Sequence, residues 1–374
     1  MKSRPTVTQV LHQGGGAGSV TSTLHLSLGL MGAGWHVRFV CPPDSEVEQL
    51  ARDGGLEVHP LRLERGSRIR NARRLARLLA SWPSHLVNSQ SARDREALAW
   101  LALTRRLRIP LIVTRRQMPR SFVVENWLVS RLAARMIAVS PAVGEALVRL
   151  GTPRRKLAVV PNGLVAARVD VPVSADDLEQ WRLAIGWDAA HRTIGIVSRP
   201  KDQAIVVAAL DRISTPVRLV LAGVGGDERL AAAIVRVPAR HAVVTLPFVS
   251  NVRPLYDLLE LVLLPSRMEG FSQALLEAMA LGKPVVASAA TGNLDLVTDG
   301  TDGLLVPPAD PSAWASAIER LLADPPLRER LGAAARRTAR ERYPLERTVE
   351  RTAAVYREVL RCTASGARAD SSPD

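Results

Sequence analysis

The sequence predicts an α/β protein with two parallel-sheet domains in tandem. The chain has 374 residues, which is too long for one compact core and suits two domains of ordinary size. Short apolar runs alternate with helical stretches, the pattern of parallel strands joined by crossover helices. This alternation begins near residue 6, stops in a polar stretch after residue 165, and starts again near residue 193.

The first half contains the apolar segments of one open sheet. They are residues 6–11, 35–41, 57–61, 85–88, 111–114, 136–139 and 158–160. A glycine-rich loop at residues 14–19 follows the first of them, and we expect a helix from about Val20 to Met31. The N–H groups of such a loop can cradle an anion, although the spacing G-x-G-x-x-G of dinucleotide sites is absent. The alternative is an ordinary tight turn.

The second half repeats the pattern. Its predicted strands are residues 193–197, 218–222, 242–245, 261–264, 285–287 and 304–306, and three further helices follow from Pro311 to about Cys362. The small, polar end of the chain from Thr363 to Asp374 is predicted to be disordered.

These segments predict four parts of the chain. Residues 1–165 form a Rossmann-like domain, residues 166–190 a linker, and residues 191–345 a second Rossmann-like domain. Residues 346–374 form a C-terminal segment. We expect a cleft between the two domains.

Composition restricts the class of protein. With 47% hydrophobic and 23% charged residues the chain is globular. The two cysteines, Cys41 and Cys362, are too far apart in sequence to indicate a disulfide framework or a metal site, which fits a reducing cytoplasm. No apolar run reaches the ~18 residues of a membrane span, and Met1 is not followed by a signal-like segment.

The net charge of +14 is concentrated in the first half. Residues 1–170 carry 26 Lys and Arg against 11 Asp and Glu, whereas the rest carries 24 against 25. A basic half attached to a neutral half indicates that the first half faces something anionic, such as a membrane surface, an acidic acceptor or nucleic acid.

The most informative segment lies near residue 265. A buried strand at residues 261–264 is followed by Pro265 and Ser266, then by Glu269 and by a helix that contains Glu277. Ligands of such units bind beyond the carboxyl ends of the strands. Eight residues of helix separate the two carboxylates by about 12 Å, at 1.5 Å per residue. That distance matches a diphosphate with a sugar on either side.

This segment, PSRMEGFSQALLEAMALGKPVVAS, resembles the donor site of retaining glycosyltransferases of family 4, which have the GT-B fold. The alternative is a surface helix with salt bridges. The resemblance is strong from Leu157 to about Arg342 and weaker from Thr6 to Ser140. It implies two Rossmann-like parallel-sheet domains facing each other across a cleft, with the final helices packed back on the first domain.

The resemblance implies roles for the donor-site residues. Glu269 would hold the hydroxyls of the donor sugar, and Glu277 those of the ribose. Arg199 and Lys201, directly after the first strand of the second domain, would bind the diphosphate and stabilise the departing nucleotide. The family has a longer spacer and a glycine after the lysine, which this sequence lacks. A surface position is therefore the alternative for Lys201.

Further donor contacts follow from the same resemblance. They are Gly270, Phe271 and Ser272 beside Glu269, Gly223 and Phe248 around the base, and Gly15, Gly16 and Ala17 in the first glycine loop. The turn from Thr291 to Asp295 is expected to support the site, with aspartate where the family has glutamate.

First-domain residues are expected to meet the acceptor. The family often has a histidine where this sequence has Arg116, and another where it has Gln90. Arg115, Arg116 and Gln90 are therefore predicted to contact an anionic acceptor, and ordinary surface positions are the alternative.

Two basic stretches of the first half are candidates for contact with a membrane. Residues 68–79 combine arginines with apolar residues near helical spacing, and residues 118–135 include Phe122, Trp127 and Leu128. The alternative for each is an ordinary amphipathic helix packed on the sheet.

The sequence thus predicts a retaining, metal-independent glycosyltransferase with no cofactor and a nucleotide-diphosphate sugar as co-substrate. The resemblance implies front-face displacement, assisted by the leaving phosphate. The expected acceptor is a glycan or lipid, at the cytoplasmic face of the inner membrane, in lipopolysaccharide, glycolipid or surface polysaccharide synthesis. Glycosylation of a soluble small molecule and sugar-nucleotide epimerisation are the alternatives. Nucleic acid is disfavoured as a partner, because aromatic residues make up 4% of the chain and no nucleic-acid motif occurs.

Overall fold

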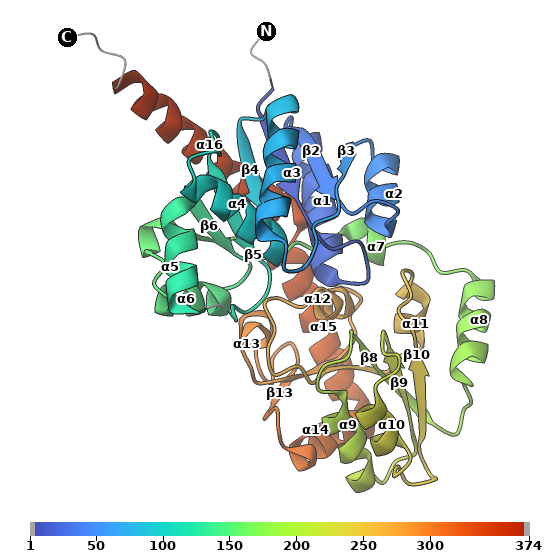
Figure 1. Cartoon of the computed structure of the whole chain (residues 1–374). Helices are drawn as coiled ribbons and strands as arrows, with labels where there is room; N and C mark the ends of the chain where they lie inside the picture. Colours follow the sequence, from blue (N-terminus) through green and yellow to red (C-terminus); the bar gives the residue numbers. More distant parts are fainter. Residues whose placement is uncertain (1–3, 121, 370–374) are drawn as a thin grey trace. The chain divides into compact units, whose positions relative to one another are not determined.

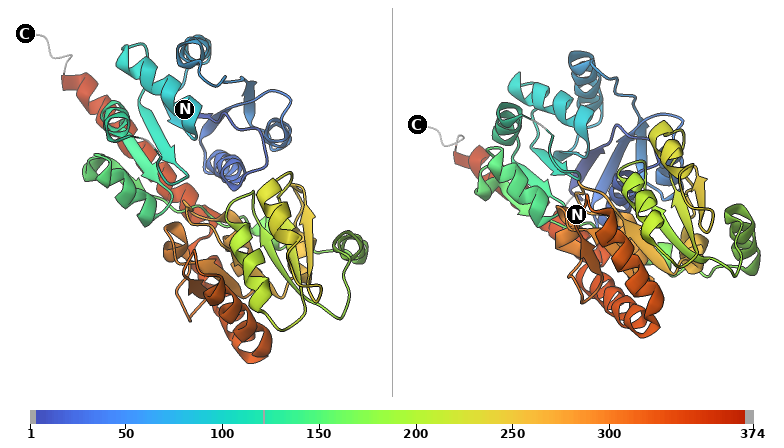
Figure 2. Two further views of the ribbon diagram at one scale, coloured as in Figure 1. Left: turned by 60° about the horizontal axis from the view of Figure 1, so that its bottom comes forward. Right: turned by 90° about the horizontal axis from the view of Figure 1, so that it is seen from below.

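The computed structural model describes residues 4–120 and 122–369. Its chain divides into two compact units. Unit 1 comprises Met1–Gly163 and Leu345–Asp374, and unit 2 comprises Leu164–Pro344. Figure 1 shows strands alternating with helices in both, and Figure 2 shows helices flanking each sheet.

Unit 1 is a seven-stranded parallel sheet in the order β3-β2-β1-β4-β5-β6-β7. Its strands are β1 (Thr6–Val10), β2 (His36–Cys41), β3 (Glu57–Pro60), β4 (Leu86–Ser89), β5 (Leu111–Arg115), β6 (Arg135–Ala138) and β7 (Leu157–Val159). Its α-helices are α1 (Gly18–Gly32), α2 (Glu46–Asp53), α3 (Arg68–Ser81), α4 (Ala92–Leu103), α5 (Val123–Leu132), α6 (Pro141–Arg149) and α16 (Leu345–Ala369). A short 3-10 helix spans Arg154–Lys156.

Unit 2 is a six-stranded parallel sheet in the order β10-β9-β8-β11-β12-β13. Its strands are β8 (Arg192–Val197), β9 (Val217–Ala222), β10 (Ala242–Leu246), β11 (Leu261–Leu264), β12 (Val285–Ser288) and β13 (Leu304–Val306). Its α-helices are α7 (Ala166–Val169), α8 (Ala175–Ile185), α9 (Gln203–Ala209), α10 (Glu228–Ile234), α11 (Arg253–Leu258), α12 (Gln273–Ala280), α13 (Gly292–Leu296), α14 (Pro311–Ala323) and α15 (Pro325–Arg342). A 3-10 turn at Leu210–Arg212 follows α9.

The predicted α/β class is confirmed, and every predicted strand is present with its ends shifted by at most one residue. Two segments differ from their predictions. Residues 166–190, predicted as a linker, contain α7 and α8 and belong to unit 2. The tail predicted to be disordered is helical as far as Ala369, and residues 370–374 lie outside the described residues.

Helix α16 completes the core of unit 1. Val349, Ala353 and Tyr356 are buried against α1 and the sheet, and the rings of Tyr356 and Trp35 meet edge to face with centroids 5.4 Å apart. The Tyr356 hydroxyl accepts hydrogen bonds from Gln9 and Asn88, at 3.0 and 2.6 Å. Burial of large apolar side chains is the main stabilising contribution here, at roughly 1.5–3 kcal/mol each.

Candidate functional site

The order of strands reverses once in unit 2, between β8 and β11. In open α/β sheets, ligands bind beyond the carboxyl ends of the strands at such a reversal. Arg199 and Lys201 follow β8, and Glu269 follows β11, so the chain brings two cations and one carboxylate to this point.

Lys201 and Glu269 form an ion pair at this reversal. The Lys201 side chain is 34% exposed, and that of Glu269 is mostly buried. Gln203 holds the loop in place, because its Nε2 donates to Ser198 Oγ at 3.1 Å and to the Arg199 carbonyl at 2.8 Å. The Lys201 backbone N–H donates to Gln203 Oε1 at 2.6 Å. The loop is thus fixed by hydrogen bonds, whereas the lysine head remains partly accessible.

Arg199, Gly223 and Phe248 lie at the ends of neighbouring strands. The Arg199 side chain is exposed and forms no ion pair with another residue in the described part of the chain. Gly223 has a φ of +96°, and a Cβ added there would lie 2.8 Å from the Ser198 carbonyl oxygen. Only glycine therefore lets the turn after β9 approach the loop that carries Arg199. Phe248 is exposed in the segment after β10.

A second turn supports Glu269. Its backbone N–H donates to Thr291 Oγ1 at 2.9 Å, and its carbonyl accepts from the Gly292 N–H at 3.1 Å. A Cβ on Gly292 would lie 2.2 Å from the Gly270 carbonyl oxygen, so this contact requires glycine. Thr291 has a φ of +43°, a strained conformation for a β-branched residue and one that the sequence does not reveal. Such strain is frequent at functional sites.

Ser272 and Phe271, which were predicted to contact the donor, make structural contacts inside unit 2. The Ser272 hydroxyl caps α12 by accepting from the Leu275 N–H at 3.3 Å. The ring of Phe271 is buried and packs edge to face on Tyr343, with centroids 5.1 Å apart. Both side chains therefore fix the entry into α12, which carries Glu277.

Glu277 is buried and forms an ion pair with Arg168 of α7, with 2.9 Å between Oε1 and Nε. Burial raises the pKa of the Glu277 carboxyl, and the Arg168 guanidinium opposes this shift. The sequence predicted Glu277 but not its partner. Arg168 lies 109 residues earlier, in a segment predicted as a linker, so no local signal connects the two.

The glycine loop of unit 1 connects β1 to α1. Gly16 has a φ of +65°, which favours glycine, and Ala17 precedes α1 without a side-chain cap. A Cβ on Gly15 would lie 3.1 Å from Glu46 Oε2. A carboxylate therefore lies beside the loop, and contact of Gly15, Gly16 and Ala17 with the donor stays a prediction.

The predicted acceptor contacts are buried in unit 1. Arg116 donates from Nε to Gln90 Oε1 at 2.8 Å and from Nη1 to Asn162 Oδ1 at 2.7 Å. Burial lowers the pKa of Arg116 to about 10 and that of Arg115 to about 9. Arg115, Arg116 and Gln90 are thus buried at the ends of neighbouring strands. Their contact with an acceptor stays a prediction.

The two candidate membrane segments differ in burial. In α3, Ala72, Leu75 and Leu78 are buried, so its apolar face packs inside unit 1. In and beside α5, large apolar side chains are exposed: Phe122 (83%), Val123, Val124 (74%) and Trp127. We call these four residues the α5 apolar surface. Arg131 stacks on Trp127, with 5.2 Å from its Cζ to the ring centroid.

The described residues contain neither a candidate membrane span nor a candidate metal site. Across residues 4–120 and 122–369, no helix combines the length and apolar character that a membrane span needs. In the same part of the chain, no three His, Cys, Asp or Glu side chains are grouped to hold a metal ion.

Comparisons with known proteins agree with this architecture. Residues 191–324 match the family model described as "Glycosyl transferases group 1", and residues 17–163 match the "Glycosyl transferase 4-like domain". A lipopolysaccharide core biosynthesis mannosyltransferase, LpcC of Rhizobium leguminosarum, is 30% identical over 281 residues, which are 72% of this chain and 77% of that protein. An uncharacterized glycosyltransferase of Methanocaldococcus jannaschii is 30% identical over 235 residues. That match covers 60% of each chain, so this chain spans less than two thirds of that relative.

The same fold occurs among solved structures. The crystal structure of HepE from Anabaena in complex with UDP and glucose superposes with a TM-score of 0.81 at 20% identity, covering 94% of this chain and 98% of that one. At this identity the likeness concerns the fold, which is GT-B.

Proposed function

Because the chain belongs to the family 4 type of glycosyltransferases, we propose that it transfers a sugar from a nucleotide-diphosphate sugar to an acceptor hydroxyl, with retention of anomeric configuration. The observation that carries this proposal is the Lys201–Glu269 ion pair where the strand order of unit 2 reverses. A cation and a carboxylate at one point suit a ligand that joins a diphosphate to a polyhydroxyl ring.

Each proposed role follows from the chemistry of the group. Arg199 and Lys201 bind the diphosphate and stabilise the negative charge that develops on it as the sugar departs. Glu269 accepts hydrogen bonds from hydroxyls of the donor sugar. Glu277, on the helix that follows, accepts hydrogen bonds from the ribose, while the Arg168 guanidinium opposes the rise in its pKa that burial causes. Gly223 and Phe248 flank the base.

The pair can rearrange at low cost when the donor binds. A partly exposed ion pair contributes only about 0–1 kcal/mol to stability. Moving Lys201 from Glu269 to a phosphate therefore costs little and frees the carboxylate for sugar hydroxyls. In the free protein the ion pair keeps both groups at the reversal point.

The acceptor is proposed to be a glycan or a lipid-linked glycan at the cytoplasmic face of a membrane. The similarity to LpcC, whose name places it in lipopolysaccharide core biosynthesis, supports this class of acceptor. The α5 apolar surface supports contact with an anionic membrane, because it is exposed and the basic side chains of Arg120 and Arg131 flank it.

The experiment is a screen of nucleotide sugars for thermal stabilisation, followed by transfer assays with each donor that binds. A ligand at 100 times its dissociation constant adds roughly 2.7 kcal/mol to stability. We expect Glu269→Gln to lose transfer and Glu179→Gln, an exposed position on α8, to retain it. Product analysis by NMR reports the anomer. Stabilisation by no nucleotide sugar, an inverted anomer, or epimerised donor without transfer would each contradict the proposal.

A further inference from the structure

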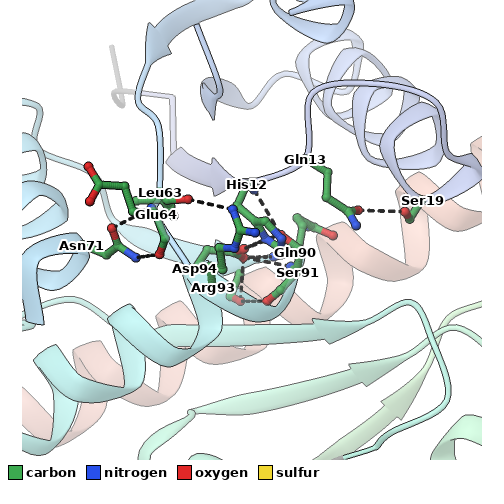
Figure 3. Close-up of polar contacts among 11 residues, drawn as sticks. His12, Gln13, Ser19, Leu63, Glu64, Asn71, Gln90, Ser91, Arg93 and Asp94 are labelled. Carbon is green, nitrogen blue, oxygen red and sulfur yellow. Dashed lines mark hydrogen bonds and ion pairs between the residues drawn. The ribbon is translucent and has the colours of Figure 1, made fainter. Parts of the chain in front are cut away.

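Unit 1 has its own reversal of strand order, between β1 and β4. His12 follows β1 by two residues, and Ser91 and Asp94 lie at the start of α4, which follows β4. Their side chains meet across this reversal, as Figure 3 shows. The position is the one where open α/β sheets bind ligands.

One nitrogen of His12 is held by two oxygens. Nδ1 lies 2.6 Å from Ser91 Oγ and 3.1 Å from Asp94 Oδ1, and the His12 backbone N–H donates to Ser91 Oγ at 3.1 Å. The Ser91 hydroxyl donates its single hydrogen to Asp94 Oδ1. Nδ1 therefore carries the imidazole proton, since a lone pair there would face a carboxylate oxygen.

Asp94 is wholly buried and fully hydrogen-bonded. Its Oδ2 accepts from Ser89 Oγ at 2.9 Å and from the backbone N–H groups of Gln90 and Ser91 at 2.8 Å each. Burial by itself raises the pKa of the Asp94 carboxyl, but the hydrogen bonds from His12 and Ser91 outweigh it and lower that pKa below its ordinary value. The carboxylate is ionised, which fixes the tautomer and the orientation of the ring.

In the neutral ring, the remaining nitrogen, Nε2, is a hydrogen-bond acceptor. No described residue supplies it with a hydrogen bond, and the His12 side chain is partly exposed. A neutral ring nitrogen accepts a hydrogen bond and carries no charge that would attract a phosphate, so it favours groups that donate hydrogen bonds. Such a ring nitrogen suits a hydroxyl of a saccharide.

We infer that His12 binds a hydroxyl of the saccharide acceptor through Nε2, at a subsite built in unit 1, with Ser91 and Asp94 as positioning residues. This inference rests on the proposed function, since it names where that reaction's second substrate is held. It involves no bond-making step, and its ligand is recognised by hydroxyl groups alone.

The test uses two variants that separate substrate contact from structural support. His12→Asn places an amide N–H where Nδ1 stands, so it keeps the contact to Ser91 and Asp94 but removes the acceptor at Nε2. His12→Gln reaches the position of Nε2 with an amide oxygen. His36→Asn is the control, because His36 is an exposed histidine of the same unit, paired with Glu57.

Binding of methyl α-glycosides of glucose, mannose and N-acetylglucosamine to the full chain is measured by saturation-transfer NMR, and the ¹⁵N resonances of the histidines are followed. We expect at least one glycoside to bind the wild type and to move the Nε2 resonance of His12. We expect His12→Asn to weaken that binding about tenfold, the scale of one hydrogen bond, with folding unchanged, and His12→Gln to recover part of it.

Two results would overturn the inference: no glycoside binding by the wild type, or equal binding by His12→Asn and the wild type. Nucleotide-sugar binding is measured on the same samples. If the donor binds all variants equally while the glycoside result is negative, the subsite alone has failed. If no donor binds the wild type either, the proposed function has failed.

Discussion

Lys201 and Glu269 lie 68 residues apart in sequence and form an ion pair at the only point where the described sheet of unit 2 reverses its strand order. Each follows a different strand, β8 and β11, and each is held by its own turn: Gln203 fixes the first loop and Thr291 the second. The pair is therefore a product of the topology.

The lysine is expected to act on the diphosphate. Lys201→Met should lower kcat/KM on the order of 10²-fold, because a cation is removed from the group on which negative charge develops. Steady-state transfer kinetics with the donor from the screen measure this effect. Arg182→Met, on exposed helix α8, serves as the control and should keep the wild-type rate. Equal kcat/KM for Lys201→Met and the wild type would exclude the assigned role.

Much of this fold was predictable because its strands are short apolar runs bounded by turn residues. The segment 261–264 has no polar residue, and the strand β11 matches it. The helices α7 and α8 were not predicted, because α7 has only four residues and the polar composition of α8 resembles that of a linker. Ser174 caps α8, and α8 also packs on α11, a helix distant from it in the sequence.

The site was predictable where chemistry follows directly from a strand end, as for Arg199, Lys201 and Glu269. The site was not predictable where burial in the domain determines which partners a side chain has. Arg116 and Gln90 occupy equivalent positions after strands of unit 1, yet they bind each other in its interior. His12 also follows a strand, and this position indicates a candidate site residue. Its partner Asp94 lies 82 residues away, so the sequence gives no local sign of the pair.

Arg168→Ala should destabilise the protein more at pH 8 than at pH 5. Burial holds the pKa of Glu277 above its ordinary value of about 4.5, and loss of Arg168 raises it further. A carboxyl with a raised pKa in the folded state favours folding at low pH, where it is protonated, and this contribution is lost as the pH rises through that pKa. Urea unfolding at the two pH values measures the difference, which we expect to be about 1–3 kcal/mol at pH 8.

The matched control for this prediction is the double variant Arg168→Ala/Glu277→Gln. It removes both charges, so most of the pH-dependent loss should disappear. A loss of stability in Arg168→Ala that is the same at both pH values would show that the ion pair is not its cause.

Gly223→Ala should destabilise unit 2 and weaken donor binding together. Its φ of +96° is unfavourable for alanine, and the new Cβ would lie 2.8 Å from the Ser198 carbonyl oxygen. A loss of about 1–3 kcal/mol is expected from such a clash, read as a lower melting temperature. Gly225→Ala, two residues on and with open space around its Cβ, should leave both properties unchanged. Equal melting temperatures for the two variants would contradict this account of the turn.

The α5 apolar surface should mediate binding to anionic membranes. Replacing Val124 and Trp127 by serine removes exposed apolar side chains of one helix face, and should reduce co-sedimentation with vesicles of phosphatidylglycerol several-fold. Leu183→Ser is the control, because Leu183 is 73% exposed but lies in unit 2. Binding that the α5 substitutions leave unchanged would assign membrane contact, if any, to another surface.

The most direct measurement is calorimetric titration of the wild type, Lys201→Met and Glu269→Gln with a nucleotide sugar and with its nucleoside diphosphate; UDP-glucose and UDP are the first pair. If Glu269 binds the sugar and Lys201 binds the diphosphate, Glu269→Gln weakens binding of the nucleotide sugar at least tenfold and leaves binding of the nucleoside diphosphate unchanged. Lys201→Met weakens binding of both ligands. Wild-type affinity of both variants for both ligands would contradict the assignment of this strand-order reversal as the donor site.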